Sequence, residues 1–230
     1  MKKTVYIIAA LLSLSSCKFV HIDAEKFMLH GNGIVCDGEV ENRVIDSLSG
    51  FDSIELRGYG ELVVVQSDSC RVSVKANNDA FPHLDCKVED GLLTIGTKDN
   101  VRLKTEDFEV TVSLPLLRSL LVKGAGDLEM DGYTSSTPLD LEINGAGDME
   151  VERISVPELS VTIKGAGDLD LKDIDVNSLK VEIKGAGDAS LSGRAGSAEV
   201  SIAGAGDVDA SGLKVDEWKQ NKSGLGSIRR

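Results

Sequence analysis

The fold of this chain is decided by the stretch Leu159-Ser-Val-Thr-Ile-Lys-Gly-Ala-Gly-Asp-Leu-Asp-Leu171. Its central tetrapeptide, Gly-Ala-Gly-Asp, occurs five times, and the copies begin at Gly124, Gly145, Gly165, Gly185 and Gly204. Successive copies are therefore separated by 21, 20, 20 and 19 residues. A repeat of about 20 residues is typical of a solenoid, in which each repeat forms one coil stacked on the one before.

Apolar residues on both sides of the tetrapeptide fall at every second position. Before and after Gly165 they are Leu159, Val161, Ile163, Leu169 and Leu171. This is the period of a β-strand and not the 3.6-residue period of a helix. Each coil is thus predicted to contain a strand, a bend made by the glycines, a second short strand and a return loop.

The same parity predicts which side chains face the core. If the alternation continues through the tetrapeptide, both glycines lie on the inward face, while the alanine and the aspartate face outward. Parallel coils stack about 4.8 Å apart, so the repeats predict a β-helix, which we expect to be right-handed. Only 4% of the residues are aromatic, which suits a narrow core of stacked aliphatic rows. The fold class is therefore all-β.

The last repeat changes in character. When it is aligned on Gly224, Gln220 and Lys222 take the positions of Val181 and Ile183 two coils earlier. A solenoid needs a terminal coil with a polar face, because its last strand is otherwise an exposed apolar edge. We expect a polar C-terminal capping coil in which Trp218 covers the last aliphatic row. The alternative for Trp218 is a platform on which a ligand stacks.

The pattern is less regular before the first Gly-Ala-Gly-Asp. Residues 44–115 contain alternating segments and a degenerate copy of the motif, Gly58-Tyr-Gly-Glu61. This part forms either irregular coils of the same solenoid or a β-subdomain packed on it, and the sequence leaves both open. The solenoid domain is predicted to span residues 44–230, with regular repeats over residues 116–228.

The N-terminus has the features of an export signal. Lys2 and Lys3 precede an apolar run, Val5 to Leu14, that is too short to span a bilayer. The run ends in Leu14-Ser-Ser-Cys17, which resembles the lipobox of bacterial lipoproteins. We expect residues 1–16 to be a lipoprotein signal peptide, Cys17 to be lipidated, and residues 17–43 to form a tether and N-terminal cap. The alternative is an ordinary secretory signal with an incidental cysteine.

Lipidation at Cys17 predicts a location and a membrane partner. Several acyl chains anchor a protein stably where one chain does not. The expected location is the cell envelope, lipid-anchored at the outer membrane, with the membrane face left open. The formal net charge of −13 argues against a nucleic-acid partner, because phosphate binding needs a cationic surface.

Three more cysteines follow, namely Cys36, Cys70 and Cys86. An oxidising compartment allows one disulfide among them. The preferred pair is Cys70 and Cys86, because both lie in or beside strand-like segments. Three buried free thiols are the equal alternative.

The repeated aspartates, Asp127, Asp148, Asp168, Asp188 and Asp207, are the candidate site. They are expected to form an outward column, and neighbouring carboxylates repel each other by about 1 kcal/mol in water. The favoured interpretation is structural, since an aspartate can accept hydrogen bonds from backbone N–H groups at a bend. Lys123, Lys164 and Lys184, four residues earlier, could compensate the charge. Ca²⁺ bridging is the remaining alternative, so no metal site and no cofactor are assigned.

The segment Phe51-Asp-Ser-Ile54-Glu-Leu56, the in-register repeats and the lipoprotein signal together resemble the putative auto-transporter adhesin head GIN domain family. The resemblance covers roughly residues 44–228. It implies a β-helix-like fold and an exported protein. No catalytic residues define that family, so none are carried over.

An enzyme needs unlike groups gathered once in a cleft, whereas here every repeat offers the same acid. His83 is the only histidine after the predicted tether, and no zinc-binding or nucleophile-elbow motif is present. The sequence favours a non-catalytic adhesin or surface binding module for a glycan or protein ligand. A periplasmic scaffold that self-associates through its coil ends is the alternative, and a polysaccharide-active β-helix enzyme is the least favoured one.

Overall fold

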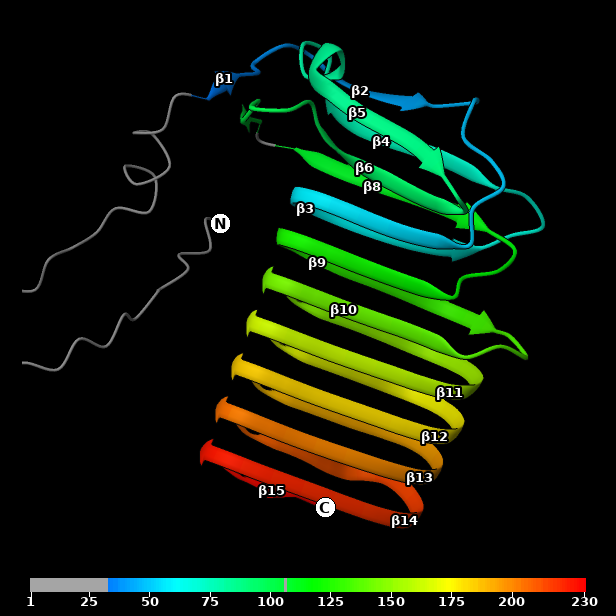
Figure 1. Cartoon of the computed structure of the whole chain (residues 1–230), viewed down its shortest axis with the longest axis vertical. Helices are drawn as coiled ribbons and strands as arrows, with labels where there is room; N and C mark the ends of the chain where they lie inside the picture. The colour runs from blue at the N-terminus through cyan, green and yellow to red at the C-terminus, as the bar shows by residue number, and fades with distance from the viewer. Residues whose placement is uncertain (1–32, 106) are drawn as a thin grey trace, which may run out of the picture. The chain divides into compact units, whose positions relative to one another are not determined.

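The computed structural model describes residues 33–105 and 107–230, and these residues form a β-solenoid of about six turns with coils of about 20 residues. Figure 1 shows the stacked strands, which confirm the predicted all-β fold. The regular coils are built from β9 (Ser119–Thr134), β10 (Leu139–Ala146), β11 (Met149–Ala166), β12 (Leu169–Ala186), β13 (Ala189–Ala205), β14 (Val208–Leu225) and β15 (Ile228–Arg229). The predicted lipidation site Cys17 lies outside the described residues.

All pairings among these strands are parallel, and equivalent repeat positions stand side by side. Leu159 pairs with Leu179, and Gly165 pairs with Gly185. Because coils align residue by residue, each inward position forms a continuous row through the core. One such row consists of Ile143, Ile163, Ile183 and Ile202, all at most 1% exposed. Burying each side chain of this size stabilises the fold by about 1.5–3 kcal/mol.

The bend at the tetrapeptide depends on its glycines, although not for the predicted reason. Gly165 has φ +133°, a region that side chains rarely adopt. A Cβ placed there would lie 1.9 Å from the carbonyl oxygen of Gly145. The expectation that the glycines face the core is therefore wrong, since the missing side chain would meet the backbone of the preceding coil. Glycine is needed because adjacent bends stack backbone on backbone.

Residues 44–115 combine both alternatives that the sequence left open. The strand β3 (Ser53–Gln66) is a true coil, paired in parallel with β9. On its other side β3 pairs in parallel with β6 (Leu92–Thr97) and β8 (Phe108–Leu114), which together form one further, interrupted coil. In the stack, this coil lies on the side of β3 opposite to β9, although its strands follow β3 in the sequence (Figure 1).

Short antiparallel strands complete the N-terminal end of the stack. The strand β4 (Arg71–Asn77) pairs with β8 and with β2 (Val40–Val44), and β5 (Leu84–Glu89) pairs with β6. A single 3₁₀ turn, η1 (Phe81–His83), leads into β5, and β1 (Ile34–Val35) pairs in parallel with β7 (Leu103–Lys104) in a separate two-stranded sheet. The strands β4 and β5 cover the edges of β8 and β6 that the interrupted coil would otherwise expose.

The polar C-terminal coil is confirmed. Gln220 stacks on Val200 and Lys222 on Ile202, so polar side chains end two aliphatic rows. Trp218 stacks on Ala198 and is packed, half-buried, against the core. Its indole Nε1 donates to Gln220 Oε1 at 2.8 Å. The tryptophan therefore covers the last apolar row, as predicted.

The predicted disulfide between Cys70 and Cys86 is not formed, and Cys36, Cys70 and Cys86 are all free. Cys70 lies in the turn between β3 and β4, where its thiol faces the carbonyl oxygen of Phe51. Cys86 lies in β5, which pairs with β6 and not with either of those strands. The two cysteines thus belong to elements that do not pair.

The thiol of Cys86 is expected to be chemically inert in the folded protein. Burial, with a smaller contribution from Asp85, raises the pKa of Cys86 to about 11. Because the thiolate is the reactive form, alkylation by iodoacetamide at mildly alkaline pH should be slower than in urea by about a hundredfold. Peptide mass mapping after a timed reaction measures this, and equal labelling in both conditions would contradict the burial of this thiol.

Candidate functional site

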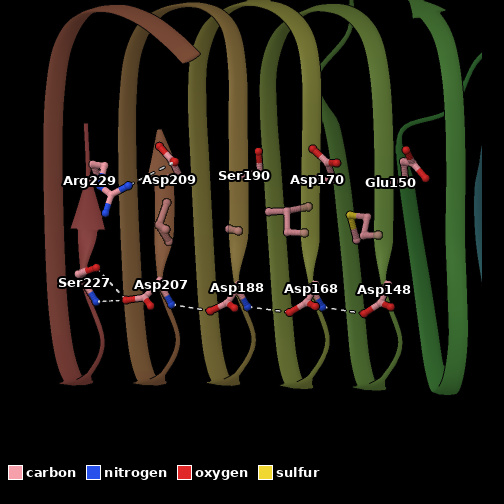
Figure 2. A pocket seen from close by; sticks show the side chains of 14 residues that line it. Asp148, Glu150, Asp168, Asp170, Asp188, Ser190, Asp207, Asp209, Ser227 and Arg229 are labelled. Atoms are coloured by element: carbon pink, nitrogen blue, oxygen red, sulfur yellow. Dashed lines mark hydrogen bonds and ion pairs between the residues drawn. The ribbon is translucent and has the colours of Figure 1, made fainter. Parts of the chain in front are cut away.

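The repeated aspartates form a ladder along the outside of the solenoid. All five are exposed, and each follows a glycine bend. Each carboxylate Oδ1 accepts a hydrogen bond from the backbone N–H of the equivalent residue in the next coil, at 2.6–2.9 Å. Figure 2 shows this chain of bonds from Asp148 to Ser227. The residues of the aspartate ladder are Asp127, Asp148, Asp168, Asp188, Asp207 and the terminal Ser227.

The ladder has a physical cause in the backbone. The parallel pairing stops at Ala166 and resumes at Leu169, so the bend between β11 and β12 interrupts the regular hydrogen bonds. The N–H of Asp168 would then lack a backbone acceptor, and an unpaired backbone donor is costly. The carboxylate of Asp148 takes this role at 2.8 Å. The expected hydrogen bonds from backbone N–H groups to the aspartates are thus present in the structure.

The ladder ends where the repeat ends. In the last coil Ser227 stands in place of an aspartate, and both its N–H and its hydroxyl donate to Asp207 Oδ1 at 2.6 and 2.7 Å. These bonds, the hydroxyl bond first, hold the pKa of Asp207 below its usual range. Serine can donate and accept, so it closes the column without adding another charge.

The predicted compensation by lysines is wrong. Lys123 pairs with Glu55 at 2.9 Å, and Lys164 and Lys184 pair with Glu142 and Glu182 at 2.7 and 2.9 Å. Each of these lysines precedes a glycine bend, while the aspartate follows it. The bend turns the chain onto another side of the coil, so four residues of spacing do not bring the two charges together.

A groove of about 620 Å³ runs beside the aspartate ladder across successive coils. Its second row of outward side chains, two residues beyond the ladder, consists of Glu150, Asp170, Ser190, Asp209 and Arg229 (Figure 2). Lys172 neutralises part of this acidic wall through ion pairs to Glu150 and Asp170 at 2.6 and 2.9 Å. Those carboxylates, Glu150 first, raise the pKa of Lys172 above its usual range. Sequence reasoning had missed this second row, although its alternation with Leu169 and Leu171 was visible.

The acidic residues that line the groove do not form a metal-binding cluster. Within residues 33–105 and 107–230, no three side chains of histidine, cysteine, aspartate or glutamate cluster so that they could hold a metal ion. His83 lies in η1, away from the groove-lining residues. The same described residues contain no helix long and apolar enough to cross a bilayer.

Comparison with known proteins is consistent with this geometry. The family described as "putative auto-transporter adhesin, head GIN domain" matches residues 50–229. A putative adhesin of Bacteroides fragilis has a similar structure, with a TM-score of 0.69 and 18% identity, over 86% of this chain and 99% of that one. No curated protein matches the sequence.

Two structures from Parabacteroides distasonis are also similar. One is a putative adhesin, with a TM-score of 0.58 and 20% identity, over 86% of this chain and 99% of that one. The other is a putative lipid binding protein, with a TM-score of 0.55 and 19% identity, over 85% of this chain and 99% of that one. At these identities the likeness is one of fold.

Proposed function

Since this chain belongs to the family described as putative auto-transporter adhesin, head GIN domain, we propose that it is a non-catalytic envelope lipoprotein that binds a partner at the cell surface. The partner, a glycan or a protein, contacts the outer faces of the solenoid. Lipid on Cys17 holds the protein at the outer membrane. The Leu14-Ser-Ser-Cys17 signal supports the anchor.

The non-catalytic role is supported by one observation: the repeated aspartates bind the backbone of the neighbouring coil. Asp168 accepts the N–H of Asp188 at 2.8 Å, and the other aspartates of the ladder do the same for their neighbours. A carboxylate engaged in this way holds the next coil in register. The repeated carboxylates therefore stabilise the stacking of the coils. The stacked coils in turn present parallel, regularly spaced rows of outward side chains. Such rows suit contact with an extended or repetitive partner more than turnover of a substrate.

Protease shaving of intact cells tests the surface location. Proteinase is added to intact cells and to lysed cells, and the protein is detected with an antibody to the solenoid beside a periplasmic control. We expect the solenoid signal to be lost from intact cells while the periplasmic control survives. Digestion only in lysed cells would contradict the adhesin role and favour a periplasmic scaffold.

A Cys17→Ser variant separates anchoring from folding. Metabolic labelling with a fatty acid should mark the wild type and not the variant, whose solenoid should still fold. Because the proposed role requires the anchored protein, cells expressing the variant should also lose attachment to host or microbial surfaces. Labelling that persists in Cys17→Ser would contradict lipidation at this residue.

A further inference from the structure

The parallel ladder on the N-terminal side of β3 is interrupted at residues 57–60. The strand β6 pairs with β3 as far as Leu56, and β8 resumes the pairing at Glu61. On the opposite side β9 pairs with this whole stretch. A Cβ on Gly165 would lie 1.9 Å from the preceding coil, whereas a Cβ on Gly58 would meet nothing within 4 Å. The space beside Gly58 is therefore open at this coil, whereas a Cβ on Gly60 would lie 2.7 Å from the carbonyl oxygen of Phe108.

The sequence departs from its repeat at the same place. Tyr59 stands in register with Ala125, in the row that carries alanine in all five Gly-Ala-Gly-Asp copies. Those alanines are exposed, while Tyr59 is half-buried. Its ring lies 5.9 Å from the ring of Phe108 in β8, tilted by 50°. Among the described residues, Tyr59 is the aromatic member of this row, and it lines the gap in the ladder.

A cavity of about 200 Å³ occupies the gap. Its apolar wall comes from Tyr59, Phe108, Val101 and Leu103, and its polar wall includes Arg57 and Arg102. An apolar protein cavity of about 150 Å³ holds one benzene molecule. The space therefore fits one benzene-sized ring with a small polar substituent.

The polar groups around the cavity favour an anionic substituent. The Tyr59 hydroxyl is buried close to the backbone of Thr105, but it makes no hydrogen bond of normal geometry with the described residues. Arg57 is oriented by Glu55, which accepts from its Nε at 2.7 Å, and this ion pair leaves the two terminal nitrogens of the guanidinium to other acceptors. Arg102 is exposed at the rim. Guanidinium groups bind carboxylates through paired, charge-assisted hydrogen bonds.

We propose that the cavity between β3, β6 and β8 is a binding site for a small aromatic carboxylate. The ring packs against the wall that the Tyr59 and Phe108 side chains form together, and the carboxylate accepts from Arg57 or Arg102 and from the Tyr59 hydroxyl. The site is independent of the adhesin role, since it uses none of the outer rows of the regular coils.

The test uses 4-fluorobenzoate as the probe and ¹⁹F line broadening as the measurement, on the folded chain without its signal peptide. We expect saturable binding that is weaker by about tenfold for 4-fluorobenzylamine, because the amine reverses the charge. Tyr59→Phe and Arg102→Gln should each weaken the binding of the benzoate several-fold. Arg194→Gln, which removes an exposed arginine of β13 outside the cavity, should leave it unchanged.

Val101→Trp is designed to fill the cavity and should abolish binding, with circular dichroism as the check on its fold. Tyr59→Phe keeps the test decisive if Val101→Trp fails to fold, since it removes only an unpartnered hydroxyl. Absence of saturable binding would overturn the proposal, as would binding that folded Val101→Trp leaves intact. Equal binding of the amine and the benzoate would overturn the assignment to carboxylates.

Discussion

Replacing Gly165 by alanine should destabilise the solenoid by about 2–6 kcal/mol, because two costs of roughly 1–3 kcal/mol coincide. The residue has φ +133°, and its Cβ would lie 1.9 Å from the carbonyl oxygen of Gly145. Neither atom belongs to a flexible side chain, so relief requires two coils to separate. For a domain of this size, thermal unfolding monitored by circular dichroism should shift down by about 10 °C.

Substitutions at two other glycines measure the cost of the backbone conformation and the cost of the Cβ contact separately. A Cβ on Gly167 would lie 1.8 Å from Gly147 O, and this glycine is outside the left-handed region. Gly58 has φ +114° and open space around its Cβ. Gly167→Ala therefore reports the contact alone and Gly58→Ala the conformation alone, and each should cost about 1–3 kcal/mol. A Gly165→Ala protein as stable as the wild type would contradict backbone stacking at the bends.

Replacing Tyr133 by phenylalanine should cost about 2–6 kcal/mol, since it leaves two buried polar groups without a partner and each costs roughly 1–3 kcal/mol. Tyr133 is fully buried. Its hydroxyl donates to Leu117 O at 3.0 Å and accepts from Leu117 N at 2.9 Å. This pair of bonds holds the segment that connects β8 to β9, where the chain enters the regular coils. Urea unfolding of wild type and Tyr133→Phe measures the loss.

Tyr59→Phe is the matched control, because its hydroxyl makes no hydrogen bond of normal geometry with the described residues. The same chemical change should there be neutral or slightly stabilising. A loss of stability at Tyr59 as large as that at Tyr133 would show that removal of a phenol hydroxyl costs the same with and without partners. That result would contradict the role given to the bonds with Leu117.

The regular part of the fold was predictable because one repeat determines all its copies. The alternation around Gly165 fixed which side chains are buried, and the change at Gln220 and Lys222 marked the last coil. The bonding of the aspartates was also among the expected interpretations. The inference about the lysines failed because it continued the parity of a straight strand through a bend, where the two sides of the tetrapeptide face different directions.

The irregular part could not be predicted from periodicity. The interrupted coil of β6 and β8 lies before β3 in space but after it in the sequence, and the repeat contains no signal of such a reversal. The cavity beside Tyr59 depends on a pairing that is absent between Leu56 and Glu61. The only sign of this cavity in the sequence was Tyr59, which stands in Gly58-Tyr59-Gly60-Glu61 where the regular copies have alanine.

The structural role of the aspartates is tested most directly by thermal unfolding of wild type, Asp168→Asn and Asp168→Ala, each in EDTA and in millimolar CaCl₂. We expect Ca²⁺ to leave all three melting temperatures unchanged. Asp168→Ala should be less stable by about 1–2 kcal/mol because the N–H of Asp188 loses its acceptor, and Asp168→Asn should lie between the two. A saturable increase in melting temperature with Ca²⁺ that Asp168→Asn abolishes would contradict the ladder and make the aspartates cation ligands.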